Sequence, residues 1–168
     1  MIAVLQRVSD ASVSVDGKVV GKIDKGLLIF LGIYKNDNEE DINFLSEKIP
    51  TFRIFNDERD KMNLSLLDVN GEVLVVSQFT LCGNWRKGRR PSFLDAADPE
   101  FGNQLYEKFV ENLKNFANLI SEKGNTNVKI VVKNNSKNLI FELSKKRKIN
   151  PKILKSLKNE LYLKRINL

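Results

Sequence analysis

Histidine is absent from this chain of 168 residues, and cysteine occurs once, at Cys82. A single cysteine cannot form a disulfide within the chain. Without histidine, and with one thiol, the usual zinc ligand sets and the serine-histidine triad cannot be assembled. Cys82 as a nucleophile would need a neighbouring base, and no histidine supplies one. The sequence therefore excludes several large classes of enzyme.

Long apolar segments are missing too. No run approaches the roughly 20 residues needed to cross a bilayer, and the first residues lack the charged and apolar regions of a secretory signal. We therefore expect a cytoplasmic protein. The chain is 42% hydrophobic and contains ten Phe, which is enough for a single domain with one sizeable core.

Acidic residues are scarce at the end of the chain. Residues 145–168 contain nine Lys or Arg and one acidic residue, Glu160, whereas residues 1–144 carry a net charge of −1. Pro151 opens a helical pattern whose apolar side is formed by Ile153, Leu154, Leu157 and Leu161. We therefore divide the chain into a body, residues 1–144, and a basic amphipathic C-terminal extension, residues 145–168.

The hydrophobic pattern of the body predicts strands followed by helices. Helical spacing and an acidic first turn indicate a helix over residues 36–49, which Pro50 should end or kink. Asp98 and Pro99 are typical of the start of a second helix, with an apolar face formed by Phe101, Leu105, Phe109, Leu113 and Phe116. Strands are expected at residues 2–8, 11–15, 18–23, 27–34, 72–77, 128–132 and 139–143, with loops at 56–63 and 82–98.

These elements predict an α+β fold. We expect a curled, largely antiparallel sheet or partial barrel, with two core helices packed outside and a basic C-terminal helix. Asp16 and Gly17 predict a type I′ turn between the second and third strands. Gly32 indicates a bulge or a close approach of two backbones.

The stretch at residues 73–81 is the most informative one for function. Four consecutive aliphatic residues, 73–76, indicate a strand buried on both faces. Ser77, Gln78, Phe79, Thr80 and Leu81 follow it, so hydroxyls, an amide and backbone N–H groups lie where the strand leaves the core. Such donors can hold a carbonyl oxygen as it becomes an oxyanion. The alternative is a strand that ends in polar residues because it reaches water.

The string SQFTL at residues 77–81, followed by KGRRPSF at residues 87–93, resembles the signature of the D-aminoacyl-tRNA deacylases. VLQRV at residues 4–8 and GLLIFLG at residues 26–32 are similar to that family as well, and the similarity covers about residues 1–115. The resemblance implies a homodimeric ester hydrolase that acts on D-aminoacyl-tRNA, or on glycyl-tRNA, in translation quality control. No metal or cofactor is implied.

The resemblance also assigns residues. Ser77, Gln78, Phe79 and Thr80 would form the catalytic segment with Leu81 beside it, and the N–H groups of Phe79 and Thr80 would polarise the ester carbonyl. Thr80 as a covalent nucleophile is the weaker reading, because the sequence shows no general base to pair with it.

Four basic residues are candidates for substrate binding. The arginine that matches Arg7 helps to hold a second motif in the family, and the alternative is an arginine at a strand end paired with a surface carboxylate. Lys87, Arg89 and Arg90 lie in one loop with Trp85, and such a set can hold phosphates while the ring stacks on a base. A solvated loop explains the same charges.

The second family motif is a Gly-Pro pair that reaches the neighbouring subunit and rejects L-amino acids. The equivalent residues here, 134–139, contain no proline, because the four prolines of the chain are Pro50, Pro91, Pro99 and Pro151. Two alternatives therefore stand beside a D-specific deacylase: a deacylase with altered chiral selectivity, and a non-catalytic relative that binds nucleic acid. The basic extension has three readings, namely tRNA contact, a solvated helix, and binding to a membrane surface.

Overall fold

The computed structural model describes residues 1–86, 89–121 and 130–133. The predicted strand at 139–143, the extension at 145–168, residues 134–139 and Lys87 lie outside the described residues. The expectations that concern them are therefore neither met nor contradicted by the structure.

The centre of the molecule is a sheet of four strands in the order β1 (Ile2–Val8), β4 (Gly26–Gly32), β7 (Glu72–Ser77) and β8 (Ile130–Lys133). β1 is antiparallel to β4, whereas β4 is parallel to β7 and β7 is parallel to β8. The expectation of a largely antiparallel sheet is wrong for this sheet. The reason is that helical crossovers, rather than tight turns, join β4 to β7 and β7 to β8, and a crossover returns the chain in the same direction.

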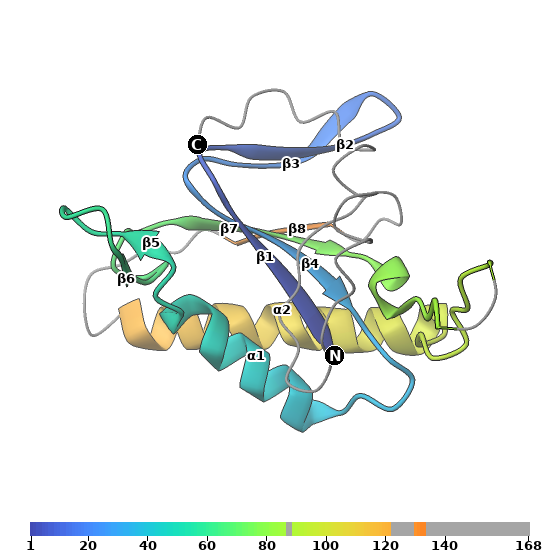
Figure 1. Ribbon diagram of the computed structural model, residues 1–168. Coiled ribbons are helices and arrows are strands. Elements are labelled where there is room, and N and C mark those ends of the chain that lie inside the picture. Colours follow the sequence, from blue (N-terminus) through green and yellow to red (C-terminus); the bar gives the residue numbers. More distant parts are fainter. Residues whose placement is uncertain (87–88, 122–129, 134–168) are drawn as a thin grey trace.

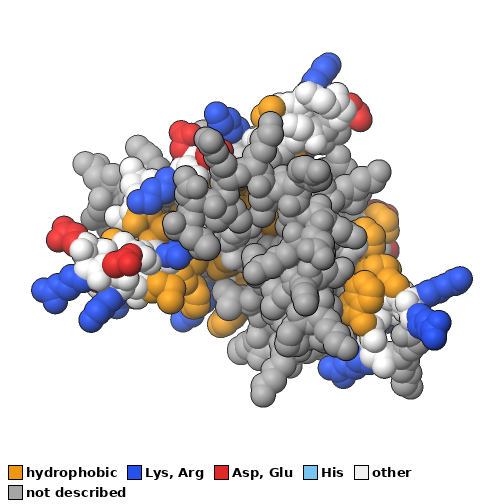
Figure 2. All heavy atoms as spheres, turned by 45° about the horizontal axis from the view of Figure 1, so that its top comes forward, with side chains coloured by type: hydrophobic (Ala, Val, Ile, Leu, Met, Phe, Trp, Pro, Cys, Tyr) orange, Lys and Arg blue, Asp and Glu red, His pale blue; other side chains and the backbone are white. Residues whose placement is uncertain are grey.

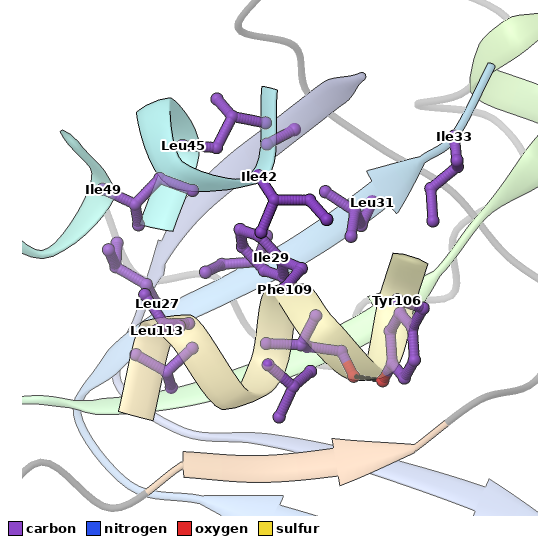
Figure 3. Close-up of a cluster of buried hydrophobic side chains, with 14 of the residues drawn as sticks. Leu27, Ile29, Leu31, Ile33, Ile42, Leu45, Ile49, Tyr106, Phe109 and Leu113 are labelled. Carbon is purple, nitrogen blue, oxygen red and sulfur yellow. Dashed lines mark hydrogen bonds between the residues drawn. The ribbon is translucent and has the colours of Figure 1, made fainter. Parts of the chain in front are cut away.

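The two helices cover one face of the central sheet (Figure 1). They are α1 (Glu39–Thr51) and α2 (Pro99–Ser121). Alternate residues of β4 face them and join a buried cluster drawn in Figure 3, which includes Leu27, Ile29, Leu31, Ile42, Phe109 and Leu113. The buried hydroxyl of Tyr106 donates a hydrogen bond of 2.9 Å to the carbonyl oxygen of Val75, and so ties α2 to β7.

A hairpin covers the other face of the sheet (Figure 1). It consists of β2 (Ala11–Val15) and β3 (Lys18–Ile23), which are antiparallel. Ile23 of the hairpin packs against the sheet residues that face away from the helices. These are Val4, Phe30, Leu74 and Val76. Since residues 73–76 are buried and divide between the two clusters, β7 is buried on both faces as predicted. Asp16 and Gly17 have φ angles of 49° and 76°, which confirms the predicted type I′ turn.

The fold is therefore a mixed α+β architecture with helices, sheet and hairpin in layers. Across the described residues the sheets do not close into a barrel. The expected loop at 56–63 is shorter than predicted, because β5 (Phe55–Asn56) pairs with β6 (Met62–Leu64) and only residues 57–61 lie between them. This small ribbon was missed since its strands are too short to show alternation.

The second helix, α2, begins at the predicted cap, whereas α1 begins three residues after the expected start at residue 36. Asn38 caps α1 through a capping box with Asp41, and Asp98 caps α2 by accepting hydrogen bonds from the N–H groups of Glu100 and Phe101. Pro50 lies inside the last turn of α1, which ends one residue later. The predicted strand at 27–34 is shorter, because β4 ends at Gly32 and Tyr34 instead forms an isolated bridge with Ala96.

Candidate active site

A short helix begins immediately beyond the buried strand β7. Gln78 adds one more hydrogen bond to the sheet, from its N–H to the carbonyl oxygen of Leu31 at 2.8 Å. The chain then turns into the 3₁₀ helix η1 (Phe79–Cys82). The predicted site residues at 77–81 therefore span the junction between a rigid strand and a helix start.

Two backbone N–H groups at this junction have no acceptor among the described residues, and they belong to Phe79 and Thr80. The next N–H groups are used, because Leu81 donates to Gln78 and Gly83 donates to Thr80. Orphan donors are expected in the first turn of a helix, since no preceding turn supplies carbonyls for them. Two adjacent donors held by a strand on one side and a helical turn on the other can stabilise an oxyanion without moving.

The side chain of Gln78 is buried, with 1% of its surface exposed. Its Nε2 donates a hydrogen bond to Oγ1 of Thr80, while its Oε1 has no partner within the part of the chain that the structure describes. A buried amide oxygen without a partner costs about 1–3 kcal/mol. Gln78 thus fixes the hydroxyl of Thr80 and leaves one acceptor of the junction unsatisfied.

Gly32 lets η1 lie against the end of the sheet. A Cβ atom on Gly32 would be 2.9 Å from Cβ of Leu81 and 3.2 Å from the carbonyl oxygen of Gln78. It would also be 2.6 Å from Cγ2 of Ile2. The expected close backbone approach is therefore confirmed, and the partner that approaches is the predicted site segment.

Arg7 does not lie beside that segment in this chain. It pairs with Leu27, whereas Ser77 is level with Leu31, so the two positions are about 13 Å apart along the sheet at about 3.3 Å per residue. One guanidinium nitrogen of Arg7 donates a 2.7 Å hydrogen bond to Oδ1 of Asn56. The sequence could not reveal this separation, since it depends on which strands pair and in which direction.

The loop that follows η1 carries exposed basic residues. Arg89 and Arg90 are exposed, and so is Arg86, which the sequence reasoning did not single out although it adjoins Trp85. Asn84 and Ser92 exchange backbone hydrogen bonds of 2.8 and 3.0 Å across the loop. The structure therefore brings these arginines and Trp85 to the same end of the molecule as η1.

Two features are absent from residues 1–86, 89–121 and 130–133. No group of three or more His, Cys, Asp or Glu side chains is placed to hold a metal ion. No described helix is both long enough and apolar enough to cross a bilayer.

The fold and the site together define an α+β protein in which a buried strand delivers two unpaired amides, an arrangement suited to acyl-ester chemistry. Comparison with known proteins gives the family. The family model described as D-Tyr-tRNA(Tyr) deacylase matches residues 4–137, and the chain belongs to this family.

Curated relatives agree with this assignment. The chain is 60% identical over 124 residues to a D-aminoacyl-tRNA deacylase of Thermosipho africanus, a match that covers 74% of this chain and 83% of the relative. It is 61% identical over 117 residues to a D-aminoacyl-tRNA deacylase of Caldicellulosiruptor saccharolyticus, with 70% and 78% covered.

Two solved structures are similar as well. One is described as the c-Myc DNA unwinding element binding protein, with a TM-score of 0.68 and 33% identity over 82% of this chain and 85% of that one. The other is described as a probable eukaryotic D-amino acid tRNA deacylase, with a TM-score of 0.60 and coverage of 70% and 68%. At 19% identity, the second supports the fold alone.

Proposed function

We propose that this chain hydrolyses the ester bond of D-aminoacyl-tRNA, with glycyl-tRNA as a second substrate, in translation quality control. Family membership and the curated deacylases at about 60% identity support the reaction. The structural observation that carries the proposal is the pair of unpaired amides, Phe79 and Thr80, at the end of a buried strand.

The proposed mechanism uses the backbone. The N–H groups of Phe79 and Thr80 donate to the ester carbonyl oxygen and stabilise the charge that develops when water attacks the carbonyl carbon. An aminoacyl ester is already reactive, and the adjacent ribose hydroxyl assists the attack, so orientation and oxyanion stabilisation are the main demands on the enzyme. Ser77, Gln78 and Leu81 hold the segment in place, and Thr80 contributes its amide rather than a nucleophile.

Substitution of Phe79 by proline tests the role of its amide. Proline suits the first position of a helix, and the preceding Gln78, at φ −147° and ψ 86°, lies outside the α region that a following proline disfavours. Phe79→Pro removes the N–H and the ring, whereas Phe79→Ala removes the ring alone. Loss of one oxyanion donor should lower kcat about 100- to 1,000-fold beyond the effect of Phe79→Ala.

Single-turnover deacylation of D-aminoacyl-tRNA measures both variants, with circular dichroism as a check on folding. Equal rates for Phe79→Pro and Phe79→Ala would contradict the backbone mechanism. A wild-type protein that leaves the ester intact would contradict the proposed function itself.

The loop cations are proposed to bind the phosphates of the substrate. Arg89 and Arg90, together with Lys87, would each release counterions on binding, so the affinity for tRNA should fall steeply between 50 and about 200 mM salt. We assign the extension, residues 145–168, to the same electrostatic contact. Its removal should flatten the salt dependence, and an unchanged slope would contradict that assignment.

A homodimer in the cytoplasm is the proposed state of the protein. Arg7 lies at the end of the sheet opposite its own η1, so a role in substrate binding requires that it act in the partner subunit's site. Arg7→Ala should then lower deacylation in the dimer. Sedimentation of the full chain tests the oligomeric state, and a monomer with full activity would remove this role for Arg7.

Altered chiral selectivity is a second candidate. The chain has no proline between Pro99 and Pro151, so it cannot present the Gly-Pro pair through which the family rejects L-amino acids. Cleavage rates for matched D- and L-aminoacyl-tRNA measure the chiral selectivity. Cleavage of both supports lost selectivity, whereas cleavage of the D form alone shows that another part of the chain performs the rejection.

The resemblance to the c-Myc DNA unwinding element binding protein favours a third candidate, nucleic-acid binding without catalysis. The same cations and Trp85 would serve that role. Tight binding of tRNA without ester cleavage would support it over the deacylase.

A further inference from the structure

Three aromatic side chains lie near one another beside η1: Phe79, Phe93 and Trp85, here called the aromatic row. The rings of Phe79 and Phe93 meet edge to face, with centroids 5.3 Å apart and an angle of 65° between their planes. Phe93 and Trp85 converge on Gly83, because Cε1 of Phe93 and Nε1 of Trp85 lie 3.0 and 3.4 Å from the place a Cβ on Gly83 would occupy. The row therefore starts at the proposed oxyanion site and leads away from it.

The row is open to solvent. Phe79 and Trp85 are 44% and 48% exposed, and Phe93 is half-buried. Aromatic surface of this size is costly to leave in water, and tryptophan in particular is enriched where proteins bind partners. Asn84 fixes the loop that carries Trp85, since it exchanges backbone hydrogen bonds with Ser92 and its side chain accepts one of 3.1 Å from the N–H of Arg86.

The loop that carries the row is basic. Arg86, Arg89 and Arg90 are exposed, and residues 79–94 contain neither Asp nor Glu. Figure 2 shows hydrophobic side chains bordered by basic ones at the right of the molecule, the side on which Figure 1 places the loop after η1. A surface of exposed aromatic rings edged by cations is complementary to a polyanion whose repeating unit carries a flat ring, namely single-stranded nucleic acid.

We propose that the aromatic row binds the unpaired nucleotides that precede the aminoacylated terminal ribose, with Trp85 stacked on one of their bases. This inference rests on the proposed function, because the ester must lie at the amides of Phe79 and Thr80 for the row to meet the neighbouring nucleotides. The bases then follow the row from Phe79 toward Trp85, and the arginines neutralise the phosphates between them. A duplex keeps its bases stacked on each other and offers none to the row.

Tryptophan fluorescence measures this contact directly, because Trp85 is the only tryptophan in the sequence. The probe is an eight-nucleotide single-stranded RNA without an amino acid, titrated into the full-length protein while tryptophan fluorescence is recorded. The control RNA is the same strand annealed to its full complement, a blunt-ended duplex with no unpaired nucleotides. We expect the single strand to quench the fluorescence and the duplex to leave it nearly unchanged.

The matching variants are Trp85→Ala and Trp85→Phe. Loss of one base-aromatic stack should raise the KM for aminoacyl-tRNA about 5- to 150-fold with kcat within about twofold, and Trp85→Phe should restore most of the affinity. Phe44→Ala, which removes an aromatic residue of α1 that is 42% exposed, is the matched control and should leave KM unchanged.

The outcomes separate this proposal from the one above. Quenching by the duplex equal to that by the single strand, or an unchanged KM in Trp85→Ala, would overturn the stacking of unpaired bases on the row. Because the titration uses RNA without an ester, it reports on the aromatic row even when no deacylation occurs. Active deacylation with no fluorescence response would remove the row and leave the proposed function standing.

Discussion

The two ends of the central sheet treat their polar groups differently. At the amino end of β7, Glu72 accepts a 2.8 Å hydrogen bond from the N–H of Asp24 and donates its own N–H to Lys25, while Arg7 bonds to Asn56. At the carboxyl end, the N–H groups of Phe79 and Thr80 and Oε1 of Gln78 have no partner among the described residues.

The paired polar groups at the amino end of the sheet support the stability of the fold, whereas the unpaired groups at the carboxyl end lower it. Buried and terminal polar groups are normally satisfied, and each that is not costs free energy. The amino end meets this rule through contacts between residues far apart in the chain. The carboxyl end departs from it within three consecutive residues, 78–80, which are the ones that carry the proposed oxyanion site.

Gly26, at the amino end of β4, gives the largest expected loss of stability. A Cβ on Gly26 would lie 1.8 Å from the carbonyl oxygen of Glu72, and only a shift of both backbones could relieve that overlap. Gly26→Ala should therefore destabilise the protein by about 3 kcal/mol or more. Chemical denaturation measures this free energy.

Gly102→Ala is the matched control for that variant. Gly102 lies in α2, where a Cβ would find Cβ of Ala97 at an ordinary 3.6 Å. Alanine is the better helix former, so this variant should gain about 0.5–1 kcal/mol. Equal losses in both variants would contradict the close approach of β4 and β7.

Gly32→Ala probes the other end with the same change. The new methyl would press on Ile2 and on Leu81 of η1, at a cost of about 1–3 kcal/mol. Displacement of η1 by about 1 Å should lower kcat about 100-fold, because the oxyanion donors move with it. Assayed below its unfolding temperature, a Gly32→Ala protein with full activity would show that η1 does not carry the donors.

Thr80→Ala separates the side chain from the backbone at the unsatisfied end. If the amides carry the chemistry, kcat should fall by less than about tenfold. Stability should fall by about 1 kcal/mol, because Nε2 of Gln78 loses its acceptor. Thr80→Ser keeps the hydroxyl and serves as the control. A loss of several orders of magnitude in Thr80→Ala, restored by Thr80→Ser, would mean that the hydroxyl takes part in the reaction.

The smallest effect is expected from Asp68, in the turn that leads into β7. Hydrogen bonds from the hydroxyl and the N–H of Ser65, at 2.6 and 2.7 Å, hold the pKa of Asp68 below its ordinary value of 3.8. A lowered pKa in the folded state stabilises the protein above the unfolded value, and the gain is lost as pH falls through the folded value.

Asp68→Asn should therefore be less stable than the wild type at pH 7, and the difference in stability should narrow as the pH falls below 3.8, the ordinary pKa of the carboxyl. Urea denaturation across this range measures the gap. Glu111→Gln, on the exposed side of α2, controls for the loss of one negative charge. A gap that stays constant with pH would contradict the proposed bond to the carboxylate.

Much of the fold could be predicted because its signals are local. The cap at Asp98, the turn at Asp16 and Gly17 and the buried strand at 73–76 each arise from neighbours within a few residues. The ribbon of β5 and β6 was missed, and so was the parallel pairing of β4 with β7, since neither is encoded in a periodic run.

The candidate site divides in the same way. The segment at 77–81 is contiguous, so its hydroxyls, amides and position after a buried strand follow from the sequence. The places of Arg7 and of the aromatic row do not, because they depend on strand pairing and on the packing of Phe93 and Trp85 around Gly83.

By itself, the sequence determined the kinds of element, their approximate bounds, the absence of histidine chemistry and the stretch that carries the candidate site. Short-range sterics and hydrophobic periodicity suffice for these. Only the tertiary structure decided that β4, β7 and β8 run parallel, that Arg7 and η1 lie at opposite ends of the sheet, and that three separated aromatic residues form one row. Those features come from contacts between distant residues, which local pattern does not specify.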